Sequence, residues 1–322
     1  MMEKTPGLES QIAGSLWGAV VGDALGVPVE FRSRADLAQH PVVTMTGNGT
    51  HHQPPGTWSD DSSLIFCTLE SLLECNHLVA QDMAERFLRW LRRGYWTPYG
   101  EVFDLGIATR QALARFAEGR PLARCGGREE FDNGNGSLMR LIPVSLWVCN
   151  TTPEEAIASS HLASIITHAH LRSQLVCGFF TLMVRGLHQQ LPPLDALKQA
   201  WSQAEALYST DEEFHTEWPA LHRMHPDVLS LMDEADVPSS GYCVHTLEAA
   251  VWTLLKSQSF EECVLRAVNL GEDTDTTGCV AGALAGLVYG VESIPPGWTQ
   301  ALARHGDVTE IIGKFTQRIV RR

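Results

Sequence analysis

Apolar residues recur along most of the chain at three- to four-residue spacing, which is the period of an amphipathic α-helix. Clear examples are the segments 64–73, 83–91, 197–208 and 244–255, each with its apolar residues on one helical face. Alternating apolar and polar positions, which would predict strands, are nearly absent, and the closest candidate is the short stretch 41–45. The pattern therefore predicts an all-α protein.

No Ser/Gly-rich or Pro-rich linker interrupts this helical pattern. Three less regular stretches, 31–57, 119–134 and 209–241, look like insertions between helices. We therefore expect a single compact domain over residues 1–322, built as an orthogonal bundle of about a dozen helices.

Two of the expected helices carry glycine at every fourth position. The glycines are Gly14, Gly18, Gly22 and Gly26 in the first and Gly278, Gly282, Gly286 and Gly290 in the second. A glycine inside a helix costs about 1 kcal/mol relative to alanine, so eight of them need a compensating interaction. Positions four apart share one helix face, and a face without side chains lets another backbone approach closely. We expect both helices to lie deep in the bundle, in a position to contact each other.

Acidic residues exceed basic ones along the chain, 38 Asp plus Glu against 24 Lys plus Arg, for a net charge of -14. This balance argues against binding to nucleic acid or to an anionic membrane surface, and it suits a protein that holds cations. The apolar stretches 14–29 and 278–291 fall short of the about 20 residues that a membrane span needs. The first residues lack the apolar core of a secretory signal, and the eight cysteines never form C-x-x-C. We expect reduced thiols and a cytoplasmic location.

Two acidic clusters directly precede predicted helices. One is Ser59-Asp60-Asp61, and the other contains Asp273, Asp275 and Thr276. N-capping alone would favour such residues at a helix start, because their oxygens accept the free backbone N–H groups. The two clusters together, however, offer four carboxylates and several hydroxyls, which are the hard oxygen ligands that Mg²⁺ and Mn²⁺ prefer. If the clusters meet in space, their mutual repulsion requires a metal pair.

The motifs of the chain resemble, in order, those of the ADP-ribosylglycohydrolase family, over about residues 12–298. They are G-D-A-L-G-V-P-V-E at 22–30, G-T-W-S-D-D-S at 56–62, F-D-L-G at 103–106, N-G-S-L-M-R at 135–140, T-H at 167–168 and G-E-D-T-D-T at 271–276. The resemblance is to the dinitrogenase-reductase-activating glycohydrolase type and the related ADP-ribosylarginine and ADP-ribosylserine hydrolases.

The resemblance implies an all-α bundle with a binuclear Mg²⁺ or Mn²⁺ centre at the base of a cleft for ADP-ribose. The implied metal ligands are Ser59, Asp60, Asp61, Asp273, Asp275 and Thr276. The resemblance also implies acid/base or gating roles for Glu30 and Asp104. The implied substrate contacts are Asn135, Gly136, Ser137, Met139 and His168.

Each implied role has a structural alternative. Glu30 would be a surface acid if the helix before Pro28 simply ends there. Asp104 would be only the N-cap of the following helix. His168 would be a hydrogen-bonded structural histidine, and Arg140 would pair with a core carboxylate instead of lying near the ligand.

Other nearby residues carry weaker expectations. His51 and His52 lie in a polar loop and are expected to be solvated, whereas Trp58 or Trp96 would border the cleft. The chain also departs from the family pattern at two positions. Ser59 stands where Thr is frequent, and Glu272 replaces a usual Gly, so that its carboxylate either joins the site or points outward.

The function that the resemblance implies is hydrolysis of the bond between C1 of the terminal ribose and an acceptor on a modified protein or small molecule, releasing ADP-ribose. Metal-bound water and a nearby carboxylate suit this chemistry, whose transition state has oxocarbenium character. Two alternatives remain open: a non-catalytic ADP-ribose binder on the same scaffold, and a phosphohydrolase that cuts the diphosphate. The acceptor is not readable from the sequence.

Overall fold

The computed structural model describes residues 6–322, and all regular structure in that range is helical. The α-helices are α1 (Leu8–Gly26), α2 (Arg34–Gln39), α3 (Asp60–Cys75), α4 (Ala80–Arg93), α5 (Ile107–Ala117), α6 (Ile142–Trp147), α7 (Pro153–Ser164), α8 (Leu171–His188), α9 (Pro193–Tyr208), α10 (Pro226–Leu229), α11 (Cys243–Leu255), α12 (Phe260–Val268), α13 (Thr274–Tyr289), α14 (Pro296–Ala301) and α15 (His305–Val320). Within residues 6–322 no strand forms, and the stretch 41–45 is irregular. The predicted fold class is confirmed.

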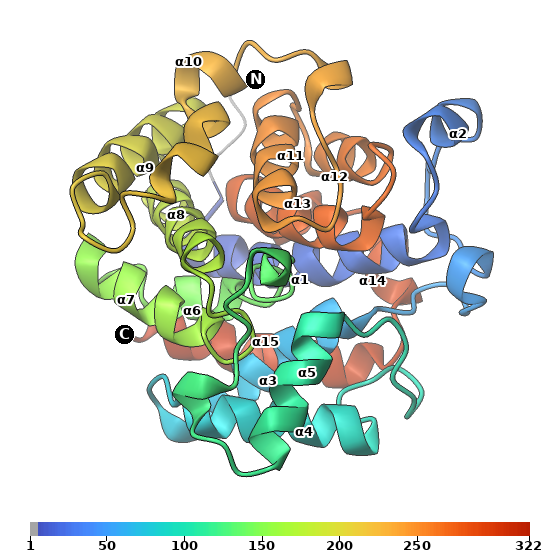
Figure 1. The fold of residues 1–322 in the computed structure, drawn as a ribbon. Coiled ribbons are helices and arrows are strands. Elements are labelled where there is room, and N and C mark those ends of the chain that lie inside the picture. The colour runs from blue at the N-terminus through green and yellow to red at the C-terminus, as the bar shows by residue number, and fades with distance from the viewer. Residues whose placement is uncertain (1–5) are drawn as a thin grey trace.

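Helices α1 and α13 lie side by side through the middle of the molecule, and other helices surround them (Figure 1). Their glycine faces meet directly. A Cβ added at Gly18 would lie 2.2 Å from the carbonyl oxygen of Gly282, and one added at Gly22 would lie 2.0 Å from that of Gly278. No side chain fits at such distances, so the four-residue glycine repeat is explained by contact between two helix backbones, as predicted.

The apolar segment at the start of the chain is longer than the sequence suggested. Residues Leu8–Val29 form a continuous run of 22 residues, and its most apolar 18-residue window has a mean hydropathy of 1.4. By length and composition this is enough to cross a membrane, so the expectation that this stretch is too short was wrong. In the fold, 94% of the most apolar part of this run is buried inside the protein. The same composition is typical of a helix that other helices cover on all sides.

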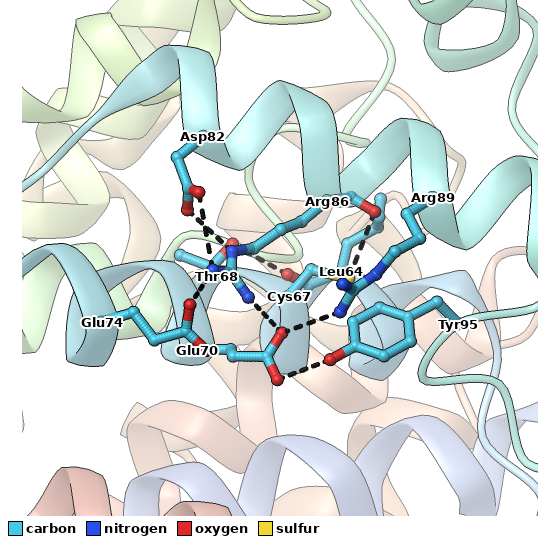
Figure 2. A network of polar contacts seen from close by, with 9 residues as sticks. All are labelled: Leu64, Cys67, Thr68, Glu70, Glu74, Asp82, Arg86, Arg89 and Tyr95. Carbon is cyan, nitrogen blue, oxygen red and sulfur yellow. Dashed lines mark hydrogen bonds and ion pairs between the residues drawn. The ribbon is translucent and has the colours of Figure 1, made fainter.

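The pairing of α3 with α4 depends on one buried cation (Figure 2). The Arg86 guanidinium, only 8% exposed, contacts Glu70, lies 2.5 Å from Glu74 and lies 2.7 Å from Asp82. Tyr95 donates a further hydrogen bond of 2.5 Å to Glu70. Because a charged group with this many hydrogen bonds is well compensated, it fixes α4 against α3, whose first turn contains one of the acidic clusters.

The three stretches that we expected to be irregular consist of loops and short helical turns. The first contains only α2 and a 3₁₀ turn at Gly49–His51, and the last contains α10 and a 3₁₀ helix at Trp218–Met224. All eight cysteines are unpaired, and seven of them are buried, in agreement with the expected reduced thiols.

Candidate functional site

The C-terminal end of α1 positions both acidic clusters. The Asp23 carboxylate, fully buried in α1, accepts hydrogen bonds from the backbone N–H groups of Ser59 at 2.9 Å and Ser62 at 3.0 Å, and so caps the start of α3 from another helix. On the other side, the hydroxyl of Thr274 donates a 2.8 Å hydrogen bond to the carbonyl oxygen of Gly26, which ties the start of α13 to the end of α1. Two segments more than 200 residues apart are thereby brought together.

Of the four carboxylates of the clusters, Asp60, Asp61 and Asp275 are buried, and Asp273 is partly exposed. Burial raises the pKa of each one, and for three of them repulsion from neighbouring acids raises it further. One oxygen each of Asp61 and Asp275 is buried with no hydrogen-bond partner among the described residues. A divalent cation would neutralise the repulsion between these carboxylates and would give the unpaired oxygens a partner. These residues therefore fit a metal centre.

Glu30 faces the same acids and is not a surface residue. It follows a 3₁₀ turn at Val27–Val29 and is only 4% exposed. Its carboxylate oxygen lies within 4.8 Å of ligand oxygens of Asp273 and Asp275. Burial, together with the charges of Asp104 and Asp273, raises the pKa of Glu30 to about 7. The alternative of a surface acid is therefore wrong.

His51 is a neighbour of Glu30 that sequence reasoning missed. Its Nε2 contacts the Glu30 carboxylate, and its ring lies 5.3 Å from that of Phe103. The hydroxyl of the preceding residue, Thr50, donates a 2.7 Å hydrogen bond to the carbonyl oxygen of Glu30. The expectation of a solvated His51 was wrong because the loop folds back over Glu30; His52, in contrast, is exposed as expected.

Asp104 precedes α5 without capping it. The N-cap of α5 is Gly106, which makes no side-chain cap hydrogen bond, and Asp104 has a left-handed backbone with φ of 49°. One ligand atom each of Glu30, His51 and Asp104 lies within 4.8 Å of the other two. The backbone conformation thus turns the Asp104 carboxylate toward Glu30 and away from its own helix, so the N-cap alternative is wrong.

A second wall of the site is the 134–137 turn with His168, which meets the acids at Asp273. The Asn135 amide donates hydrogen bonds to Asp273 at 2.7 Å and to the Thr246 hydroxyl at 2.8 Å. Gly136 allows close approach, because a Cβ there would lie 2.8 Å from Cε1 of His168. The Ser137 hydroxyl points the other way, toward Cys177 and Ser164.

These walls enclose a cavity of about 280 Å³, which we call the acidic cleft. Of the predicted site residues, those that line it are Glu30, Asp60, Asp61, Asp104, Asn135, Gly136, Met139, His168, Asp273 and Thr276. Ser59, Ser137 and Asp275 do not line it. Ser59 instead caps α3, its Oγ accepting from the backbone N–H of Asp61 at 3.2 Å.

Apolar side chains form the outer edge of the acidic cleft. Phe31, Ile107 and Phe131 line it and are at least 68% exposed. Trp58 and Trp96 do not border it, because Trp58 is fully buried with its indole N–H donating to the carbonyl oxygen of Trp96, 3.1 Å away. The expectation that one of these tryptophans would line the cleft was wrong.

Comparison with known proteins gives consistent results over nearly the whole chain. The family model described as ADP-ribosylglycohydrolase matches residues 4–322. An ADP-ribosylarginine hydrolase Tri1 of Pseudomonas putida is 31% identical over 90% of this chain and 73% of its own length. An ADP-ribosyl-[dinitrogen reductase] glycohydrolase of Rhodospirillum rubrum is 30% identical over 92% of each chain. A solved structure described as an ADP-ribosylglycohydrolase-related protein complex superimposes with a TM-score of 0.79, at 32% identity, over 96% of this chain and 98% of its own.

Proposed function

The chain belongs to the ADP-ribosylglycohydrolase family, and from this membership we propose that it releases ADP-ribose from a modified acceptor with the help of two divalent ions, Mg²⁺ or Mn²⁺. That it is a hydrolase of this class follows from the family and from its relatives. The observation that supports a metal-dependent reaction is the set of buried, unpaired carboxylate oxygens at Asp61 and Asp275. We also propose that residues 1–322 act as one domain.

Metal ions would be held by the two acidic clusters, with Ser59, Asp60 and Asp61 from the α3 side and Asp273, Asp275 and Thr276 from the α13 side. Bound ions supply Lewis acidity and lower the pKa of a bound water. The remaining work belongs to protein groups. Glu30 and Asp104 lie close enough to share a proton-transfer role at the ribose C1.

The other wall of the acidic cleft would bind the rest of the ligand. Asn135 and Gly136 present an amide and an open backbone turn, and Met139 and His168 complete that wall. Phe31, Ile107 and Phe131 surround the opening with apolar surface, which would exclude water from the bound ligand. The acids and the binding groups meet where the Asn135 amide donates to Asp273.

We propose arginine-linked ADP-ribose on a protein as the first acceptor to test, because two relatives at 29% and 31% identity are named ADP-ribosylarginine hydrolases. The unpaired cysteines support a cytoplasmic enzyme. The test is incubation with a panel of defined arginine, serine, nucleobase and small-molecule ADP-ribosyl linkages, with Mg²⁺, Mn²⁺ or a chelator, scored by mass spectrometry.

We expect intact ADP-ribose to be released from at least one linkage, and the chelator to abolish release. Binding of ADP-ribose without turnover of any linkage would instead indicate a non-catalytic binder, and AMP plus ribose phosphate would indicate a phosphohydrolase. Asp60→Ala and Asp275→Ala should each abolish release while the helical circular dichroism persists. The matched control is Glu261→Gln on the exposed face of α12, which should leave release unchanged.

A further inference from the structure

A chain of buried polar groups lies directly behind the binding wall of the acidic cleft. His168 lines the cleft but is only 2% exposed, and its neighbours Arg140 and Thr167 are buried as well. The backbone around the histidine is fixed on Gly127, whose N–H donates to Thr167 at 3.0 Å and whose carbonyl oxygen accepts from Ala169 at 2.7 Å. The ring is therefore held by both its backbone and its side-chain contacts.

One end of this chain of hydrogen bonds has a fixed donor, the Arg140 guanidinium. Nη2 of Arg140 lies 2.8 Å from Oγ1 of Thr167, and a guanidinium only donates. The Thr167 hydroxyl has one proton, and the acceptor in contact with it is Nδ1 of His168, at 2.7 Å. If Thr167 donates to Nδ1, that nitrogen carries no proton, and a neutral imidazole must then carry its proton on Nε2.

The ring is neutral under ordinary conditions. Burial, together with the positive charge of Arg140, lowers the pKa of His168 to about 3. The His168 Nε2 lies beside the glycine turn, 3.3 Å from the position that a Cβ would take at Gly136 and 3.7 Å from that at Gly134. His168 Nε2 is thus placed beside the Gly134–Gly136 turn, where the Thr109 hydroxyl also lies, 3.1 Å from the Cβ position at Gly136.

We propose that Arg140 and Thr167 are positioning residues that fix His168 as the Nε2–H tautomer, so that this N–H donates to a phosphoryl oxygen of ADP-ribose. The identity of the ligand rests on the proposed function. A phosphoryl oxygen is a pure acceptor, so the opposite tautomer would present a lone pair to it and lose the bond. Arg140 also donates to the carbonyl oxygen of Gly136, so one guanidinium fixes both the turn and the ring.

This assignment changes the interpretation of Arg140. Pairing with a core carboxylate was the structural alternative for Arg140, but its hydrogen bonds go to Gly136, Ala163 and Thr167. Its charge is further compensated by the Phe87 ring, 4.7 Å from the guanidinium carbon. Arg140 therefore acts on the cleft through other residues and does not line it.

The tautomer is measured on the full chain without ligand. Labelling histidine with ¹⁵N and recording long-range ¹H–¹⁵N correlations distinguishes a protonated from an unprotonated ring nitrogen, and His168→Gln identifies the signal among the 13 histidines. We expect an unprotonated Nδ1 and a protonated Nε2 at neutral pH. An Nδ1–H tautomer or a charged ring would overturn the proposal even if no Thr167 variant folds.

Two variants of Thr167 test whether the hydrogen bond from its hydroxyl sets the tautomer of His168. Thr167→Val has nearly the same shape but no hydroxyl, so we expect a mixture of tautomers and a fall in ADP-ribose affinity of about tenfold or more, as for the loss of a hydrogen bond to a charged group. Thr167→Ser keeps the hydroxyl and should retain both the tautomer and the affinity. Affinity is measured by calorimetry with ADP-ribose and Mg²⁺, after circular dichroism has shown that each variant is folded.

The outcomes separate this proposal from the proposed function. If Thr167→Val keeps the wild-type tautomer and affinity, Thr167 does not position His168, although the protein still binds ADP-ribose. If the wild type shows the Nε2–H tautomer but does not bind ADP-ribose, the proposed function and the ligand assigned here are both wrong.

Discussion

Single residues with unusual backbones connect the two sides of the acidic cleft. Glu272 has a φ of 61° and Phe31 a φ of 66°, both in the left-handed region. Their backbones pair, because the N–H of Phe31 donates to Glu272 at 2.6 Å and the N–H of Glu272 donates to Arg32 at 2.7 Å. Glu272 is exposed, so its carboxylate points outward and does not join the site. The link through Glu272 holds the segment after Glu30 against the start of α13.

The positive φ at Glu272 leads to a stability prediction. A residue with a Cβ pays roughly 1–2 kcal/mol in this conformation, and glycine does not, although glycine costs more chain entropy on folding. Glu272→Gly should therefore have a free energy of unfolding about 1 kcal/mol greater than Glu272→Ala, which loses the same charge but keeps the strain. Chemical denaturation of the two variants gives this difference directly. Equal stability, or a more stable alanine variant, would show that the backbone there is unstrained.

His51 leads to a prediction about activity. Glu30 lies among other acids, and the hydrogen bond from His51 is the interaction that lowers its pKa most, so we expect His51 to keep the carboxylate in place. His51→Phe retains the ring that packs near Phe103 but cannot donate, and it should reduce kcat at least tenfold with little change in KM. His51→Gln keeps a donor and should retain most of kcat.

Steady-state kinetics on the linkage that proves active measure both constants for these two variants. Similar kcat values for His51→Phe and His51→Gln would mean that packing, and not the hydrogen bond, is what matters at this position. No sequence pattern indicates this role, because His51 lies in a polar loop and its contact depends on how that loop folds. Asp23 was equally hard to assign, since its partners lie 36 and 39 residues further along the chain.

Among the helices, periodicity predicted best where one face is buried and the other is exposed. The segments 64–73 and 83–91 lie inside α3 and α4, and 197–208 and 244–255 lie inside α9 and α11. Helices α1 and α13 have no polar face, because other helices surround them. For these two helices it was the glycine repeat, and not the hydrophobic period, that predicted their buried position.

The contact between α1 and α13 predicts opposite effects for two glycine substitutions. A Cβ at Gly282 would lie 2.1 Å from the carbonyl oxygen of Gly18, so Gly282→Ala must push two helices apart, and we expect a loss of about 3 kcal/mol or more of unfolding free energy. At Gly313 in α15 no atom lies within 4 Å of the added Cβ, so Gly313→Ala should gain about 1 kcal/mol from helix propensity. Thermal and chemical unfolding of both variants test this. A Gly282→Ala protein as stable as the wild type would contradict the close packing.

At the scale of the whole molecule, the fold brings together acids that are far apart in the chain. The sequence identified both clusters and the residues in them, but not their meeting, which requires α1 to contact α13 and to cap α3 through Asp23. A local pattern does not contain such a long-range arrangement, and only the resemblance to a family supplied it beforehand. The insertion 209–241 shows the same limit, because buried contacts such as those of His161 with Tyr208 and Phe214 fix where it begins.

His161 makes the stability of the whole chain sensitive to acid. Burial lowers its pKa from 6.5 to about 4, so below pH 6.5 the unfolded chain binds more protons at this residue than the folded chain does. The stability that this histidine provides is therefore complete above pH 6.5 and falls as the pH drops toward 4, by up to about 1.4 kcal/mol per pH unit. His161→Phe keeps an aromatic ring stacked on Phe214 but does not titrate. Urea unfolding gives the free energy of unfolding of both proteins from pH 7 to pH 4.5, relative to the value of each at pH 8. This free energy should fall more steeply with decreasing pH for the wild type than for the variant. Parallel curves would mean that the His161 ring is already charged or open to solvent in the folded protein.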